Sequence, residues 1–201
     1  MNEFFLARQP IFDRDQQVYA YELLFRDSRA NANSFALGDD ASTAQVIANA
    51  AEFGLDRLTR GHPAFINVPQ RFLEEPDLVP LDPAHTVLEI LETVVVNERC
   101  SAGVDALRAR GFRLALDDFT DSDAFDAVLP RVQIVKLDVL ALPRARWAAQ
   151  IERLRTGGCR LLAEKVETQA DYDTLRALGV DYFQGFFFAR PRLLRGRRLP
   201  P

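Results

Sequence analysis

The stretch Leu114-Ala115-Leu116-Asp117-Asp118 is a short apolar run that ends in two carboxylates. An earlier apolar run carries Glu22, and four further strand-like runs end in a polar residue: Phe65-Ile66-Asn67, Val87-Leu88-Glu89, Ile134-Val135-Lys136 and Leu161-Leu162-Ala163-Glu164. Helix-like segments separate the later runs. Parallel strands joined by helices all point the same way, so their polar C-terminal ends meet at one mouth. The pattern predicts an α/β fold, a TIM-like (βα) barrel with a shared active face.

The beginning of the chain predicts an antiparallel first strand. Phe4 to Phe12 and Val18 to Phe25 are two extended runs joined by a short polar turn, which is typical of a β-hairpin. Together with a last run at Tyr182-Phe183, they bring the count to about eight strands, the number that closes such a barrel. Helical spacing is found at 40–55, 97–110, 122–129, 143–155 and 168–178.

Length and composition indicate one globular domain. The 201 residues are 48% hydrophobic and 27% charged, enough to bury a large core, although such barrels usually have ~250 residues. We expect residues 1–190 to form the barrel. Residues 191–201 are rich in arginine and end in proline, so we expect an edge or linker toward a further domain, with a phosphate-binding tail as the alternative.

The charge pattern and the N-terminus exclude several classes. A net charge of −4 gives no global signature of a nucleic-acid-binding protein, so no DNA partner is expected. Met1 to Arg8 contains Glu3 and no long apolar run, so we expect neither a signal peptide nor a membrane span, and a cytoplasmic location. Cys100 and Cys159 fit reduced structural thiols.

The strand-end residues form an oxygen-rich set that suits Mg²⁺ or Mn²⁺: Glu22, Asn67, Glu89, Asp117, Asp118 and Glu164. Their charges would repel one another unless the set binds metal, protonates in part or is neutralised by lysine, for which Lys136 is available. Two metals about 3.5–4 Å apart are an arrangement that hydrolyses phosphate esters. Arg26 shares a strand face with Glu22 and is placed to reach a phosphate.

Each of these residues also has a simpler interpretation. An acidic residue such as Asp118 fits a helix cap near Ser122, and Lys136 fits a solvated strand end. His62 and His85 precede strands and are expected to be structural. Phe186-Phe187-Phe188 fits core or interface packing. Only the repeated position at strand ends favours a common site.

At these residues the chain resembles the EAL domain family of bacterial cyclic di-GMP phosphodiesterases over nearly its whole length. Gln9-Pro10-Ile11 is similar to the family's first motif, and Tyr21-Glu22-Leu23-Leu24-Phe25-Arg26 to its signature strand, with Leu23 in place of alanine. The other matching positions follow in family order: Asn67, Glu89 with Glu92, Asp117-Asp118-Phe119, Val135-Lys136-Leu137-Asp138, Glu164 with Glu167, and Gln184-Gly185.

The resemblance implies a role for each position. Metal ligands would be Glu22, Asn67, Glu89, Asp117 and Asp118; Lys136 would position the attacking water, and Glu164 would be the general base or its helper. Gln9 and Arg26 would contact the dinucleotide, with Gln184 also at the ligand. Glu92, Asp138 and Glu167 would support the site. The family reaction is Mg²⁺- or Mn²⁺-dependent opening of cyclic di-GMP to linear pGpG.

Departures from the family pattern affect this reaction. Thr120 and Asp121 stand in a loop where the family has glycine, which removes backbone freedom. Lys165 also replaces a glycine; its ammonium either pairs with the carboxylates and competes with metal, or points away. These features resemble the divergent EAL domains that are fused to HDOD domains in bacterial signalling proteins.

The sequence therefore favours a weakly active or inactive regulatory module that binds a ligand or protein. The alternative is an active Mg²⁺- or Mn²⁺-dependent phosphodiesterase. The expected partners are cyclic di-GMP, a protein or a fused HDOD domain, and a second copy of the chain; an inactive domain would need no metal. An unrelated metal-dependent barrel hydrolase would leave the order of the motifs unexplained.

Overall fold

The computed structural model describes residues 3–26, 39–118 and 127–197. The strands are β1 (Glu3–Asp13), β2 (Val18–Arg26), β3 (Ala64–Val68), β4 (Thr86–Ile90), β5 (Arg113–Leu116), β6 (Ile134–Asp138), β7 (Arg160–Glu164), β8 (Tyr182–Phe183) and β9 (Arg192–Arg197). The α-helices are α1 (Asp39–Phe53), α2 (Leu55–Thr59), α3 (Gln70–Glu74), α4 (Glu98–Ala109), α5 (Trp147–Thr156) and α6 (Gln169–Ala177).

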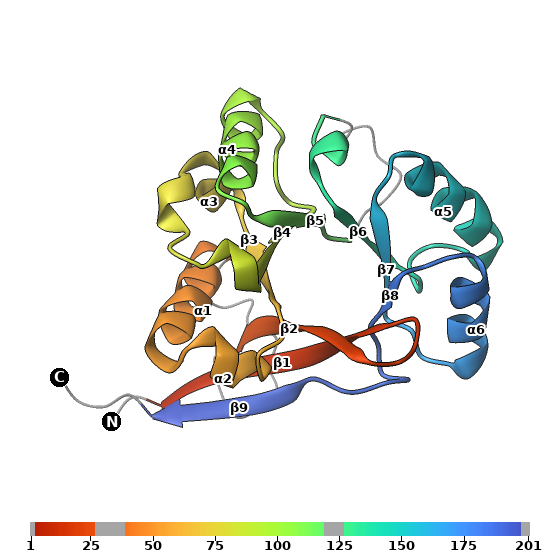
Figure 1. The fold of residues 1–201 in the computed structure, drawn as a ribbon, viewed down its shortest axis with the longest axis horizontal. Coiled ribbons are helices and arrows are strands. Elements are labelled where there is room, and N and C mark those ends of the chain that lie inside the picture. The colour runs from red at the N-terminus through yellow and green to blue at the C-terminus, as the bar shows by residue number, and fades with distance from the viewer. Residues whose placement is uncertain (1–2, 27–38, 119–126, 198–201) are drawn as a thin grey trace.

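Strands β1 to β8 close into a barrel, as the sequence predicts (Figure 1). Strands β2 to β8 pair in parallel and in chain order, and β1 closes the ring by pairing antiparallel with both β2 and β8. The expected hairpin is confirmed, because β1 and β2 pair antiparallel on either side of a short turn. In this turn the Asp13 carboxylate accepts hydrogen bonds from the backbone N–H groups of Asp15 and Gln17, both at 2.9 Å. The antiparallel first strand is therefore the strand that closes the barrel.

A ring of apolar side chains fills the barrel below its C-terminal mouth. It takes one residue from each of the eight strands, and all are buried: Ile11, Ala20, Phe65, Val87, Ala115, Ile134, Leu162 and Tyr182. We call this ring the apolar layer. Inward-facing side chains of a barrel stack in such layers because strand residues alternate between the inside and the outside. The barrel interior is thus packed with side chains, and the apolar layer lies beneath the residues at the C-terminal mouth.

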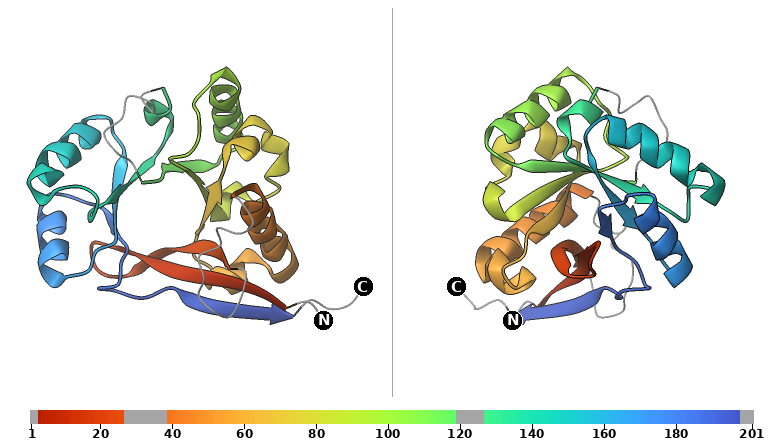
Figure 2. Two further views of the ribbon diagram at one scale, coloured as in Figure 1. Left: turned by 180° about the vertical axis from the view of Figure 1, so that it is seen from behind. Right: turned by 45° about the vertical axis from the view of Figure 1, so that its right-hand side comes forward.

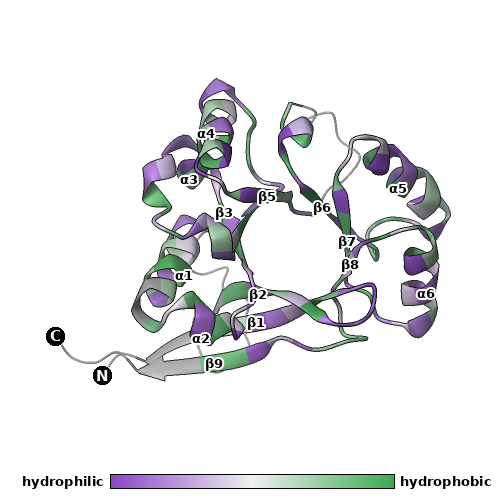
Figure 3. Ribbon diagram, viewed as in Figure 1, coloured by the Kyte–Doolittle hydropathy of each residue, from purple (hydrophilic) through white to green (hydrophobic). Residues whose placement is uncertain are grey.

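Helices cover the outside of the barrel (Figures 1 and 2). Apolar and polar residues both occur along α4, α5 and α6 (Figure 3), as expected for helices that bury one face. In α5 the buried face carries Trp147, Ile151 and Leu154. The side chain of Asn97 caps α4 through a 2.8 Å bond from the N–H of Cys100.

The predicted helices at 40–55, 97–110, 143–155 and 168–178 are confirmed as α1, α4, α5 with a preceding 3-10 turn, and α6. The predicted helix at 122–129 falls mostly outside the described residues. The short helices α2 and α3 were not predicted, because neither is longer than five residues and their apolar periodicity is too brief to detect.

Strand β9 lies outside the closed ring. It pairs antiparallel with β1 over Glu3–Arg8, so the first and last described strands run side by side (Figures 1 and 2). Part of the segment expected to be an edge or linker is therefore a strand of the sheet. Among the helices of the described ranges, none combines the length and the apolar character needed to cross a bilayer.

Candidate active site

A second ring of side chains, mostly polar or charged, lies directly above the apolar layer. Each member stands two residues from an apolar-layer residue, toward the C-terminal mouth: Gln9, Glu22, Asn67, Glu89, Asp117, Lys136, Glu164 and Gln184. We call it the polar layer. Residues two apart on a strand share a face, so all eight face inward. This spacing places the predicted ligands together, and it applies equally to Gln9 and Gln184.

Lys136 is the centre of the polar layer. Its side chain is 1% exposed, and its ammonium lies 2.6 Å from Glu89, 2.7 Å from Asp117 and 2.9 Å from Glu164. The Glu22 carboxylate is farther away, at 3.8 Å, and accepts a 2.7 Å hydrogen bond from Gln184. The simpler interpretation of Lys136 as a solvated strand end is wrong. One ammonium against four carboxylates leaves the layer negatively charged.

Burial and charge perturb the pKa values of these groups. Burial raises the pKa of Glu89 and of Glu164 well above the usual glutamate range, with the Lys136 ammonium acting in the opposite direction. Burial also acts to lower the pKa of Lys136, but attraction to the four carboxylates outweighs it, and its pKa lies well above the lysine range. The charged form of Lys136 is therefore favoured, whereas burial favours the protonated form of Glu89 and of Glu164.

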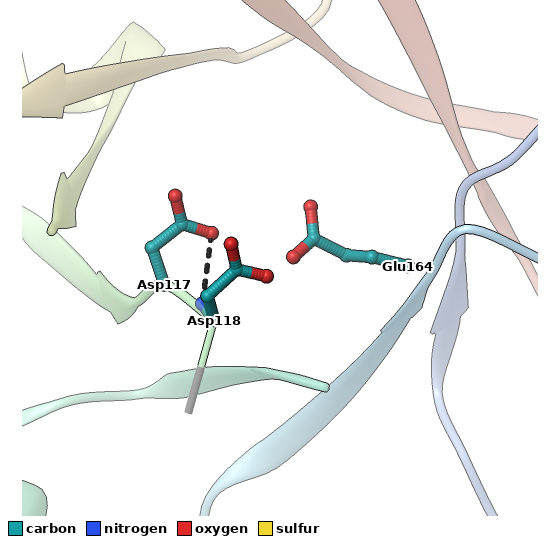
Figure 4. A group of neighbouring side chains, drawn as sticks. All are labelled: Asp117, Asp118 and Glu164. Carbon is teal, nitrogen blue, oxygen red and sulfur yellow. Dashed lines mark hydrogen bonds between the residues drawn. The ribbon is translucent and has the colours of Figure 1, made fainter. Parts of the chain in front are cut away.

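Three carboxylates converge at the mouth. One oxygen from each of Asp117, Asp118 and Glu164 lies within 4.8 Å of the others (Figure 4). Asp117 and Asp118 both reach this point because β5 ends at Leu116, and the N–H of Asp118 donates to the Asp117 carboxylate at 3.1 Å. Burial and the neighbouring Asp117 raise the pKa of Asp118.

Lys165 points toward the carboxylates, which resolves the alternative left open by the sequence. Its ammonium donates to Asp138 and lies 3.6 Å from Asp118. Burial acts to raise the pKa of Asp138, but the bond from Lys165 and two backbone N–H groups lower it overall. Lys136 and Lys165 are the two lysines among the 25 lysine and arginine residues of the chain. Both thus lie at this one site.

A cavity of about 460 Å³ opens above the polar layer. Seven of the eight polar-layer residues line it, and the eighth, Glu89, contacts the Lys136 ammonium and has no exposed surface. The other lining residues are Leu24, Asp118, Leu140, Lys165, Glu167, Gly185, Phe186 and Pro191. Gly185 is required at its position, because a Cβ there would lie 2.1 Å from the carbonyl oxygen of Val166.

The donor set fits a divalent cation. Asn67 Oδ1 and Asp118 Oδ1 are buried oxygens that accept no hydrogen bond within the described residues, and both side chains line the cavity. Carboxylate and amide oxygens of this kind are the ligands of Mg²⁺ and Mn²⁺. Asn67, Asp117, Asp118 and Glu164 would therefore hold such ions, with Glu22 and Glu89 beside them and Asp118 at the outer position.

Some predicted site residues lie elsewhere or cannot be placed. Thr120 and Asp121 lie outside the described residues, as does the Arg26 side chain. Glu92 is exposed in a turn after β4 and does not line the cavity. Asp138 reaches the site through Lys165.

The sequence analysis missed the apolar rim of the cavity. Phe186 is 52% exposed and Leu140 is 59% exposed, and both line the opening. Phe187 and Phe188 instead pack against the core, which fits the expectation for the run as a whole. The sequence carries no signal that separates Phe186 from Phe187 and Phe188, because the three are identical neighbours and differ only in how the fold buries them.

Comparison with known proteins agrees with this geometry. The "Uncharacterized protein YuxH" of Bacillus subtilis is 37% identical over 206 residues, which cover 97% of this chain and 49% of that protein. The "Cyclic di-GMP phosphodiesterase CdgJ" of Vibrio cholerae is 37% identical over 201 residues, which cover 98% of this chain and 46% of that protein. The chain thus spans about half the length of these curated relatives.

A solved structure shares the fold. A manganese and cyclic di-GMP complex of Klebsiella pneumoniae BlrP1 superposes with a TM-score of 0.74 at 26% identity, covering 96% of this chain and 56% of that one. The family described as "EAL domain" matches residues 1–191, which include the whole polar layer. The chain belongs to the EAL domain family.

Proposed function

We propose that this domain binds cyclic di-GMP at the barrel mouth and opens it slowly to linear pGpG with Mg²⁺ or Mn²⁺. The observation that carries the proposal is the convergence of Asp117, Asp118 and Glu164 beside the buried Lys136. The 37% identity to a protein named as a cyclic di-GMP phosphodiesterase supports the choice of substrate.

The cavity has the features that such a ligand needs. Its volume of about 460 Å³ lies within the usual range for small-molecule sites. The exposed ring of Phe186, with the Arg190 guanidinium 4.6 Å from its centre, offers an apolar surface at the rim. Gln9 and Gln184, two members of the polar layer, add amide groups to the cavity lining. An aromatic base and a polar backbone can both be accommodated.

The chain's own residues prepare the site for hydrolysis. Bound divalent cations would polarise a phosphodiester and lower the pKa of a water molecule. Lys136 holds Glu89, Asp117 and Glu164 in position through ion pairs shorter than 3 Å. Gln184 orients Glu22. Glu164, whose pKa burial raises well above the glutamate range, is suited to accept a proton from water.

The second candidate function is binding without turnover. The observation in its favour is that the Lys165 ammonium pairs with Asp118 and Asp138 at the mouth. The sequence favours a weakly active or inactive module because of Lys165 and the changed loop that contains Thr120 and Asp121. A slow enzyme is consistent with the complete set of carboxylates as well as with this ion pair.

The test is incubation with cyclic di-GMP and Mn²⁺, with chromatographic detection of pGpG. We expect slow product formation that Glu22→Ala abolishes and that Glu152→Ala, which removes an exposed carboxylate on α5, leaves unchanged. Calorimetry with cyclic di-GMP and Ca²⁺ measures binding separately. Binding without product would favour the second candidate, and neither binding nor product would refute both.

The relatives are about twice as long as this chain, so the domain is expected to act together with other parts of a protein. We propose a cytoplasmic signalling role, in which the domain acts with a fused HDOD domain or another protein partner and associates as a homodimer. Size-exclusion chromatography with light scattering, with and without cyclic di-GMP, tests the last point.

A further inference from the structure

Lys165 and Asp118 are both held in the left-handed region of backbone conformation, with φ of +58° and +41°. Non-glycine residues adopt it rarely, and it costs of order 1–3 kcal/mol per residue. Lys165 directly follows β7 and Asp118 lies two residues beyond the end of β5. The two strained positions thus flank the same part of the mouth, and an ion pair joins them.

The two lysines have different surroundings. Lys136 is 1% exposed and enclosed by the polar layer, whereas the Lys165 side chain is 48% exposed and stands at the rim. The ion-pair partners of Lys165 in the described structure are Asp118 and Asp138. Its ammonium therefore lies at the outer edge of the site, and its exposure leaves it room to move into solvent.

Asp118 offers this ammonium an oxygen that nothing else satisfies. Asp118 Oδ1 accepts no hydrogen bond in the described part of the chain, and the Lys165 nitrogen lies 3.6 Å from it. The ammonium also donates to one carboxylate oxygen of Asp138. The second oxygen of Asp138 accepts hydrogen bonds from the N–H groups of Leu140 and Ala141 at 2.8 and 3.0 Å. Asp138 thereby holds the ammonium beside Asp118.

We infer that Lys165 is a tethered cation that competes with a divalent metal ion for Asp118. The inference deepens the proposed function and rests on it for the identity of the competing ion. An ion that engages Asp118 must displace the ammonium from Asp118 or bind beside its positive charge, so it binds more weakly than an ion held by inner ligands such as Glu22 and Asn67. Metal occupancy at the outer position, rather than loss of ligands, then limits turnover.

The experiment titrates the metal-free protein with Mn²⁺ alone and follows free Mn²⁺ by electron paramagnetic resonance. For the wild type we expect one tighter and one weaker ion. Lys165→Met removes the charge at similar length and should tighten the weaker ion roughly tenfold, while the tighter ion changes little. Lys165→Gly should do the same, since glycine accepts the positive φ. Lys165→Arg keeps the charge and should behave as the wild type.

The matched control is Arg131→Met. Arg131 forms a 2.9 Å ion pair with Asp105 and precedes β6, at the opposite end from Asp138, so its loss should leave Mn²⁺ binding unchanged. Thermal melting confirms that each variant is folded.

Equal Mn²⁺ affinities in the wild type and Lys165→Met, to within twofold, would overturn the inference, as would a failure of both proteins to bind Mn²⁺. Binding by Lys165→Met alone would support it. Tighter Mn²⁺ binding in Lys165→Met without binding or turnover of cyclic di-GMP in any variant would leave the inference standing and refute the proposed function.

Discussion

Lys136 illustrates how a single buried charge organises a site at the residue scale. Desolvation of an ammonium costs several kcal/mol, and the ion pairs with Glu89, Asp117 and Glu164 offset that cost. The same pairs keep carboxylates together that would otherwise repel one another. Removing the lysine would therefore also destabilise the fold, because the carboxylates around it would repel one another.

We predict that Lys136→Met lowers the free energy of unfolding by about 3–5 kcal/mol, because it leaves buried carboxylates unpaired. Urea denaturation followed by circular dichroism measures this change. Lys165→Met is the matched control, since its ion pairs are half exposed and worth at most about 1 kcal/mol. The double variant Glu89→Gln/Lys136→Met should recover part of the loss. Equal stabilities for the two single lysine variants would contradict this account of the polar layer.

Tyr182 carries a second perturbed group, in the apolar layer. Burial, with Tyr19 as the next cause, raises the pKa of Tyr182 to about 12. An unfolded tyrosine has a pKa of ~10, so between pH 10 and 12 the folded protein holds more protons than the unfolded chain. Stability is unaffected by this group below pH 10 and falls as the pH rises through that window.

The measurement compares guanidinium unfolding of the wild type and Tyr182→Phe from pH 9 to 12. The wild type should lose more stability over this range, because phenylalanine has no proton to release. Cysteines, lysines and the tyrosines that do not contact Tyr182 contribute equally to both proteins. Parallel stability curves would show that Tyr182 titrates normally in the folded state.

At the scale of elements, spacing along the strands connects the sequence to the site. Positions two apart on eight strands produce the apolar layer and then the polar layer, which is why polar strand ends in the sequence correctly predict a common mouth. The short strand β8 shows this most simply, with Tyr182 below and Gln184 above.

Other features could not be read from the sequence, for physical reasons. Strand parity alone leaves the direction of Lys165 open, because its placement depends on a positive φ that only the folded loop imposes. The pairing of β9 with β1 joins segments almost 190 residues apart, and no local pattern reports such a contact. The exposure of Phe186 depends likewise on how its loop is held against Val166.

Close packing of α4 against α3 depends on Gly103. A Cβ at this position would lie 1.6 Å from the carbonyl oxygen of Leu73. We predict that Gly103→Ala destabilises the protein by about 2–3 kcal/mol, despite the better helix propensity of alanine. Urea denaturation checks the value, with Gly158→Ala as the control. Gly158 has open space around its Cα and a φ of +79°, so that variant should lose only about 1 kcal/mol of conformational energy. A stabilised Gly103→Ala would mean that α3 can move away.

At the scale of the whole molecule, barrel closure does not depend on β9. The ring is completed by β1 with β2 and β8, and β9 covers the outer edge of β1. This arrangement bears on the proposed boundary at residues 190 and 191, because a domain that ends there retains the full ring and the polar layer.

We predict that a chain truncated after Pro191 still folds. It should lose roughly 2 kcal/mol of stability, because Leu193 and Leu194 are partly buried and their apolar contacts would be lost. Thermal unfolding and Mn²⁺ binding measure the effect, with the full chain as reference. An unfolded product would show that β9 belongs to the barrel domain.

Having lysine only at positions 136 and 165 makes the site chemically addressable. Reductive methylation with isotope-labelled formaldehyde modifies amines, so apart from the N-terminus its targets in this chain all lie at the barrel mouth. The exposed Lys165 amine would take the label, and the enclosed Lys136 would be protected until the barrel opens. The Lys165 resonance, beside that of the N-terminal amine, would then report on events at the mouth without any engineered probe.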